Sequence, residues 1–203
     1  MRRTSVRIAA AAVLTAALAV TGLSGSALAA DEAAAAPAVS APSGSLAVQE
    51  DNTFLQNAAS NGIIAIALPN ATPGFSTTTG FSATFPVTGG AANFNGFYGT
   101  VQLGGGLLLV NVTNGHTVIF NNLTFNAGQW AVTGVPLGQT TPVKLLDPAR
   151  PVITAAGGTQ TLTSSDLEID AQGASYADSN LGTTFFTARQ HAGTGVLTFT
   201  AGS

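Results

Sequence analysis

The chain has 203 residues, of which 45% are hydrophobic and 7% are charged, and it contains no cysteine. A domain of this size can bury a sufficient core without disulfides, and the missing thiols exclude thiolate metal sites and a cysteine nucleophile. The few Lys and Arg residues exclude nucleic acid as a partner, because binding phosphates requires many cations.

The first 29 residues predict a cleavable export signal, and the protein is therefore expected to be secreted and extracellular. A short arginine-containing segment precedes an uncharged apolar run over residues 8–20, and the stretch ends in Ala27-Leu28-Ala29, the form that signal peptidase recognises. The apolar run is shorter than a membrane-spanning helix requires, so no stable membrane anchor is expected after cleavage.

Cleavage makes the remaining chain strongly acidic. Its three cations, Lys144, Arg150 and Arg189, stand against nine acidic residues, which gives a net charge of −6. Residues 30–49 are rich in Ala, Pro and Ser and are interpreted as a flexible linker. Residues 50–203 are expected to form a single β-sandwich domain.

The folded region is predicted to be all-β, an antiparallel β-sandwich or barrel-like domain with at most one short helix. Short runs that are apolar or alternate with period two are separated by Gly, Asn and Pro. The helix is expected over residues 172–181. The predicted strands cover residues 63–68, 81–87, 94–103, 107–113, 116–121, 129–135, 143–146, 152–154, 160–163 and 195–200.

Asn114-Gly115 predicts a tight hairpin, because this dipeptide tolerates positive φ at both turn positions. A two-residue loop pairs Thr113 with His116 and Val110 with Ile119. Both faces of this hairpin are apolar, so we expect both to be covered by other parts of the domain.

A Ser-His-Asp hydrolase finds little support in the residues, and no enzyme activity is expected. The chain has two histidines, His116 and His191, both in segments that read as turns or loops. The segment nearest to a G-x-S-x-G elbow spans residues 173–177 and lacks the final glycine.

Asp166, Glu168 and Asp170 alternate with apolar residues and therefore share one face of a predicted strand. Three carboxylates in a row are candidate ligands for Ca²⁺, which prefers hard oxygen ligands. The alternative interpretation is a solvated outer face of an edge strand, whose charges discourage pairing with another chain.

The aromatic residues have two interpretations. Those on strand-like runs are expected in the core, and Trp130 is expected to be buried as well. Residues 93–98 combine aromatic and polar side chains and are an alternative surface for a glycan or a flat ligand. The core set is Phe81, Phe85, Phe120, Phe125 and Phe199.

Haem iron is ligated in proteins by Tyr, His, Cys or Met. Because the chain after the predicted signal has no Cys or Met, the candidate ligands are Tyr98, His116, Tyr176 and His191. No spacing among the four singles out a pair.

Several glycine-rich phrases resemble a known family. Residues 99–107, GTVQLGGGL, resemble the signature G-T-V-x-H-x-G-G-L, and residues 167–174 and 180–196 follow in a similar order. The chain resembles, over residues 81–200, the HtaA-type domains, which are secreted or surface β-rich domains of actinobacteria associated with haem acquisition. Leu103 stands where the signature has His, and residues 54–60 contain no Tyr, so no haem ligand is transferred.

The sequence therefore predicts a secreted, non-enzymatic β-domain for cell-surface or envelope interaction, without a required cofactor. Its partner is a surface protein, a glycan or a small ligand. The alternative is a module for haem or a small ligand, as the resemblance to HtaA-type domains implies.

Overall fold

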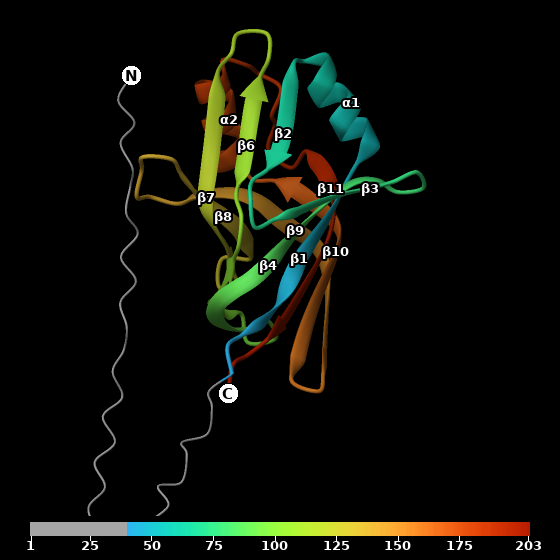
Figure 1. Ribbon diagram of the computed structural model, residues 1–203, viewed down its shortest axis with the longest axis vertical. Helices are drawn as coiled ribbons and strands as arrows, with labels where there is room; N and C mark the ends of the chain where they lie inside the picture. The colour runs from blue at the N-terminus through green and yellow to red at the C-terminus, as the bar shows by residue number, and fades with distance from the viewer. Residues whose placement is uncertain (1–39) are drawn as a thin grey trace, which may run out of the picture. The chain divides into compact units, whose positions relative to one another are not determined.

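The computed structural model describes residues 40–203, so the predicted export signal and the first half of the predicted linker, residues 30–39, lie outside the described residues. The described residues form eleven strands and two helices (Figure 1). In chain order these are β1 (Ser43–Glu50), α1 (Asn52–Ser60), β2 (Ile63–Ala67), β3 (Thr72–Ser76), β4 (Gly80–Asn93), β5 (Tyr98–Leu103), β6 (Leu107–Asn111), β7 (Thr117–Asn126), β8 (Ala131–Pro136), β9 (Val143–Ala156), β10 (Thr159–Ile169), α2 (Ala171–Leu181) and β11 (His191–Thr200).

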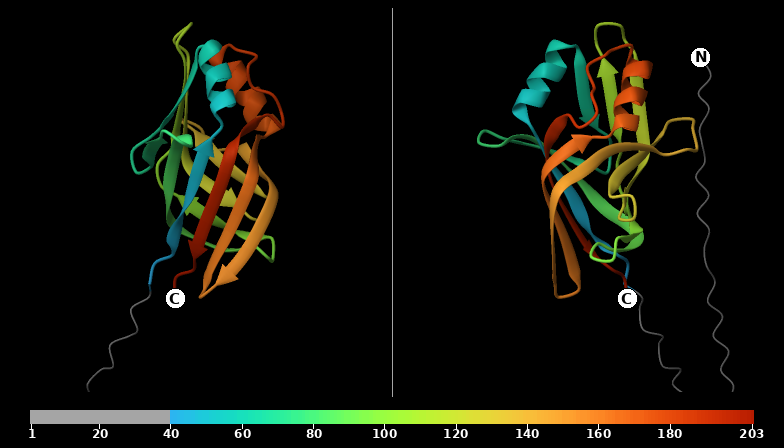
Figure 2. Two further views of the ribbon diagram at one scale, coloured as in Figure 1. Left: turned by 90° about the vertical axis from the view of Figure 1, so that its right-hand side faces the viewer. Right: turned by 180° about the vertical axis from the view of Figure 1, so that it is seen from behind.

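Eight of these strands close into an antiparallel barrel. The hydrogen-bonded order is β7-β5-β4-β1-β11-β10-β9-β8, and β8 pairs back with β7 to complete the ring. β6 and β2 extend from β7 beyond the ring, and β3 pairs with β4. Both helices lie at one end of the barrel (Figure 2). The predicted all-β antiparallel class is confirmed, with two short helices where at most one was expected.

β1 corrects the predicted boundary between linker and domain. The sequence predicts a linker over residues 43–49, yet β1 lies in the barrel wall and pairs with β11 on one side and β4 on the other. Leu46 and Val48 alternate with polar or small residues and point inward, and Leu46 is buried. The Ala- and Ser-rich composition concealed this short alternation.

The predicted Asn114-Gly115 hairpin has a longer loop and a register shifted by two residues. Val110 pairs with Thr117 and Leu108 with Ile119. The backbone leaves the ladder at Asn111, whose side-chain amide donates to the carbonyl of Leu181 at the end of α2 over 3.0 Å. A shift of two keeps every side chain on its predicted face.

The two faces of this hairpin differ in coverage. Leu109, Val118 and Phe120 face the interior and are buried. The opposite face was also expected to be covered, but Val112 is 58% exposed and lies on the outside.

An aromatic cluster fills the barrel end opposite the helices. Phe94, Phe125 and Phe199 are fully buried, and the rings of Phe94 and Phe125 meet edge to face with centroids 5.5 Å apart. Gln160 fixes this end across the barrel, because its side chain accepts from the Phe94 amide at 2.8 Å and donates to the Ala92 carbonyl at 2.9 Å.

α2 confirms the predicted helix and packs closely on β9. Asp170 caps its first turn by accepting from the Gln172 amide at 2.6 Å, and Gly182 ends it in the left-handed conformation. A Cβ on Gly173 would lie 2.6 Å from the carbonyl oxygen of Lys144, so glycine at this position allows α2 to pack closely on β9. Neither helix within residues 40–203 is long and apolar enough to cross a membrane.

Candidate functional site

A pocket of about 580 Å³ opens at the helix end of the barrel. Its floor and walls come from inward side chains of β1, β4, β7, β8 and β9 and from β2 and β6, and both helices contribute to its lining. This volume lies within the range of small-molecule sites in proteins. The barrel is thus packed with aromatic rings at one end and open at the other.

The lining of this pocket is almost entirely hydrocarbon. Leucine, isoleucine, valine, alanine and phenylalanine side chains supply most of it, and the polar side chains in the lining are Glu50, Asn52 and Gln56. Among these, Glu50 alone can carry a charge. The arrangement favours a ligand whose body is apolar and whose polar part is small.

α1 covers one side of the pocket, and its position follows from local capping. Asp51 accepts from the Phe54 amide at 2.8 Å and starts the helix directly after β1 ends. Leu55 and Ala58 then face the pocket, and Phe54 packs against Phe185 with ring centroids 5.6 Å apart.

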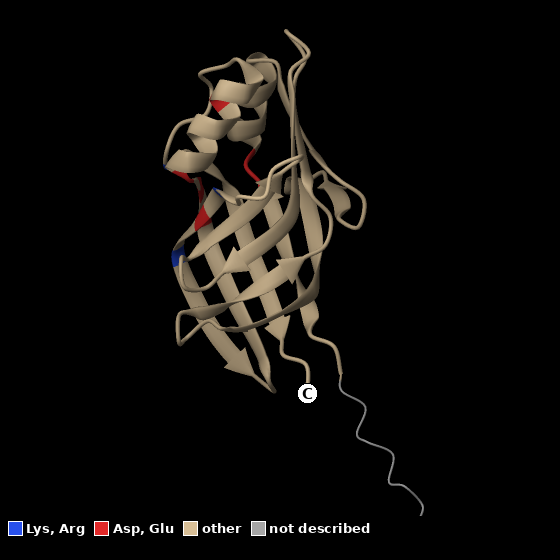
Figure 3. Cartoon of the chain, turned by 90° about the vertical axis from the view of Figure 1, so that its left-hand side faces the viewer, with Lys and Arg blue, Asp and Glu red and all other residues tan. Residues whose placement is uncertain are grey.

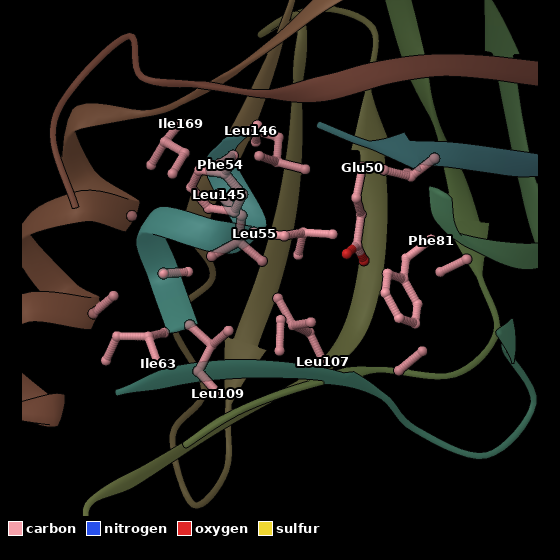
Figure 4. A pocket seen from close by; sticks show the side chains of 18 of the residues that line it. Glu50, Phe54, Leu55, Ile63, Phe81, Leu107, Leu109, Leu145, Leu146 and Ile169 are labelled. Carbon is pink, nitrogen blue, oxygen red and sulfur yellow. The ribbon is translucent and has the colours of Figure 1, made fainter. Parts of the chain in front are cut away.

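Glu50 is the last residue of β1 and continues the inward face of Leu46 and Val48. Its carboxylate points into the pocket beside the ring of Phe81 (Figure 4). Burial raises the pKa of Glu50 above its ordinary value, because the apolar surroundings disfavour the charged form.

Phe81 lies at the rim of the pocket and not in the core, where it was predicted. It is 54% exposed, while the other four predicted core phenylalanines are buried. Its ring packs on that of Phe75 in the neighbouring strand β3, with centroids 4.9 Å apart. Trp130, expected to be buried, is partly exposed and packs between Phe97 and Phe125.

None of the four candidate haem ligands lines this pocket. Tyr98 is 61% exposed beside the β4–β5 turn. His116 is exposed in the β6–β7 loop, and Tyr176 packs on Phe120, with its hydroxyl accepting from Gln139 at 2.9 Å. The residues that line the pocket therefore do not fit axial ligation of haem iron, and no pair of the four candidates is brought together.

His191 forms the one notable polar pair among the predicted site residues. Its Nδ1 lies 2.5 Å from a carboxylate oxygen of Asp166, and Arg150 lies 3.8 Å from the other. His191 also lines a shallow polar pocket of about 300 Å³ beside the main one. Within residues 40–203, no hydroxyl hydrogen-bonds to its ring, so this pair lacks the nucleophile of a triad.

The segment that resembled a nucleophile elbow lies inside α2, and not at a turn between strand and helix. Ser175 is exposed on that helix. The geometry on which the elbow depends is therefore missing from this segment.

The three predicted metal ligands have separate structural tasks. Asp166 pairs with His191, Asp170 caps α2, and Glu168 lies across from Asp147 on β9. No group of three or more acidic or histidine side chains within the described residues is placed to hold a metal ion. The alternation that suggested a shared face ends at Asp170, where the strand becomes a helix.

Residues 93–98 do not form one aromatic surface. Phe94 is fully buried and closes the packed end of the barrel, whereas Phe97 and Tyr98 are each 61% exposed. Glu50 and Phe81 are not among the site residues that the sequence predicts. The alternation Leu46, Val48, Glu50 is the signal that could have found the first.

The charged residues are distributed unevenly over the domain. Figure 3 shows the acidic residues gathered toward the helix end of the barrel, where the pocket opens. Glu50 and Asp51 lie at the junction of β1 and α1, and Asp170 and Asp178 belong to the cap and body of α2. The surroundings of the pocket are therefore acidic.

No protein-family model and no curated protein matches this chain. Among solved structures, it is similar to the crystal structure of the C-terminal domain of HtaA from Corynebacterium glutamicum. The sequence identity is 12% and the TM-score 0.51, and the match covers 79% of this chain and 99% of that one. This likeness shows the fold alone, and it confirms the β-rich part of the resemblance found in the sequence.

Proposed function

We propose that this chain is a non-enzymatic, extracellular β-barrel domain that binds a small, mainly apolar molecule. The observation that carries the proposal is the apolar pocket of about 580 Å³ at the helix end of the barrel. Burying an apolar ligand there gains roughly 25 cal/mol per Å² of surface removed from water. Location outside the cell is part of the proposal and rests on the N-terminal sequence.

Haem is not the ligand that we propose. The resemblance to HtaA-type domains implies haem, and the shared fold is consistent with a related origin. The pocket lining, however, offers no Tyr, His, Cys or Met side chain to the iron. The fold supports ligand capture in this pocket, and the lining chemistry directs the proposal to an iron-free apolar molecule.

The proposal predicts that filling the pocket abolishes binding. Ala65 lies on the inner face of β2 and lines the pocket, and Ile66 is its neighbour on the outer face. Ala65→Trp is expected to weaken binding of the neutral apolar dye N-phenyl-naphthylamine by at least about ten-fold. Ile66→Trp, the matched control, should bind the dye as the parent chain does. The measurement is a fluorescence titration of the full chain.

Equal dye binding by both variants would contradict the pocket as the site. A hemin titration provides a separate check of the ligand class. A Soret band typical of ligated haem that is lost in Tyr176→Phe or His116→Ala would overturn the choice of an iron-free ligand.

Interaction with a protein at the cell surface is a second candidate function. An apolar row on the outside of the extended sheet favours it, since Ile66, Leu108 and Ile119 lie side by side in register. Ile64 and Ile66 are each 45% exposed, and β2 has a strand partner on one side only. Sheet edges of this kind readily pair with another strand.

The partner that fits this edge best is a second copy of the chain. Antiparallel pairing of two β2 strands about Ala65 would place Ile64 of one copy opposite Ile66 of the other. Sedimentation velocity of the full chain should then show a dimer that forms as concentration rises. Ile66→Lys should shift the equilibrium to monomer. A parent chain that stays monomeric at all accessible concentrations would rule this candidate out.

A further inference from the structure

The Glu50 carboxylate is the one ionisable group among the residues that line the largely apolar pocket. It points into the pocket from the end of β1, near Leu55 of α1 and the ring of Phe81 (Figure 4). Within residues 40–203, it makes no hydrogen bond and no ion pair, and the described cations do not line the pocket. No buried polar side-chain atom in the described residues lacks a partner, so the Glu50 oxygens remain accessible in the open pocket and are free to contact a ligand.

The rim beside Glu50 is held in place by hydrogen bonds from a side chain to backbone carbonyls. The preceding residue, Gln49, donates its side-chain amide to the carbonyl of Thr79 at 2.5 Å and to that of Phe81 at 2.6 Å. These bonds tie the β3–β4 hairpin to β1. Phe81 is thereby fixed next to the carboxylate, and Phe75 supports its ring from the outside.

An aromatic ring next to a carboxylate favours a cation. The negative face of a ring attracts an ammonium group, and the carboxylate accepts its hydrogen bonds. Asp51, the neighbouring residue, lines the shallow pocket that Glu50 also lines, so two carboxylates lie at this end of β1. The same charges would repel a ligand that carries a carboxylate or a phosphate.

We propose that the ligand of this pocket is a cationic amphiphile, with an apolar body inside the barrel and a protonated amine between Glu50 and Phe81. This inference rests on the proposed function and specifies its ligand class. Glu50 then selects among apolar molecules by the group at their polar end, while the hydrocarbon walls supply affinity without distinguishing them.

Three probes of equal chain length separate these contributions: dodecylamine, dodecanol and dodecanoate. Calorimetric titrations of the full chain, below the concentrations at which the probes form micelles, should give the order amine, then alcohol, then carboxylate. A charge-assisted hydrogen bond contributes about 1.5–3 kcal/mol, so the amine should bind roughly ten-fold to one-hundred-fold more tightly than the alcohol.

Glu50→Gln keeps the shape of the side chain and removes its charge, so the ratio of amine to alcohol affinity should fall to near one. Phe81→Leu is expected to reduce that ratio in part. The matched control is Glu168→Gln, which removes a negative charge outside the pocket and should keep the full preference. Thermal denaturation establishes that each variant is folded before it is titrated.

The outcomes distinguish this inference from the proposed function. If none of the three probes binds, the apolar pocket is not a ligand site and both proposals fail. If all three bind with similar affinity, or if Glu50→Gln retains the preference for the amine, the pocket binds apolar molecules but Glu50 does not select them. Tighter binding of dodecanoate than of dodecylamine would likewise overturn the inference.

Discussion

The fold places the carboxyl group of Asp147 on β9 where its charged form is disfavoured. Its pKa is raised to about 6, first because burial disfavours its charge and then because the Asp170 carboxylate lies beside it. Glu168, opposite on β10, raises the pKa further, and Lys144 opposes the rise. The group therefore holds its proton more tightly in the folded chain than in the unfolded one.

This residue makes stability depend on pH in a defined window. The pKa of Asp147 is higher in the folded chain than its unfolded value of 3.8. Protonated Asp147 therefore contributes its full share to the stability of the folded chain below about pH 3.8, and this contribution is lost as pH rises through about 6. Asp147→Asn should raise Tm at pH 7 by roughly 2–4 °C, the shift expected for about 1 kcal/mol after solvent screening of this partly exposed group.

The test is a series of melting curves of parent and variant from pH 4 to pH 8. The two curves of Tm against pH should converge near pH 4 and separate above pH 6. A constant difference across the whole series would show that the substitution acts through packing and not through the charge of Asp147.

At the scale of elements, the short strand β1 contributes to both the core and the pocket. It lies between β4 and β11 and supplies Leu46 to the core and Glu50 to the pocket. If residues 43–49 were a linker, substitutions there would leave the free energy of unfolding unchanged. Because they form a barrel strand, large and small effects on it should alternate along the chain.

Leu46→Ala should therefore lower the free energy of unfolding by about 2–5 kcal/mol, since Leu46 is 5% exposed. Ala47→Ser, one residue along and exposed, should change it by no more than about 0.5 kcal/mol. Chemical denaturation followed by circular dichroism measures both. Similar small effects at the two positions would mean that β1 is not part of the cooperative barrel.

Elements with strong period-two patterns could be predicted from the sequence, and weakly patterned ones could not. β4 and β11 alternate apolar with polar or small residues, and β2 is a continuous apolar run. α1 was missed because its short sequence, NTFLQNAAS, has few apolar residues and depends on the cap from Asp51. The hairpin register was shifted because Asn111 bonds to α2, a contact that local turn preferences do not contain.

At the scale of the whole molecule, the class of fold followed from the sequence, but the ligand pocket did not. The pocket forms where a closed ring of strands meets two helices, and its lining residues are spread from β1 to β11. The candidates that the sequence offers are rare titratable residues such as His116 and Tyr98, and the fold places these on the outside. An apolar site has no such residues to reveal it.

The pairing of β1 with β11 also has a consequence for the time course of folding. Ser43 pairs with Thr200, so this part of the barrel wall joins the two ends of the described chain. Bringing such distant segments together lowers the chain entropy before their contacts can stabilise the fold. Domains with many such long-range contacts fold slowly. During synthesis, β1 and β10 each lack one strand neighbour until β11 has been made. The barrel wall is therefore completed only once β11 has joined it.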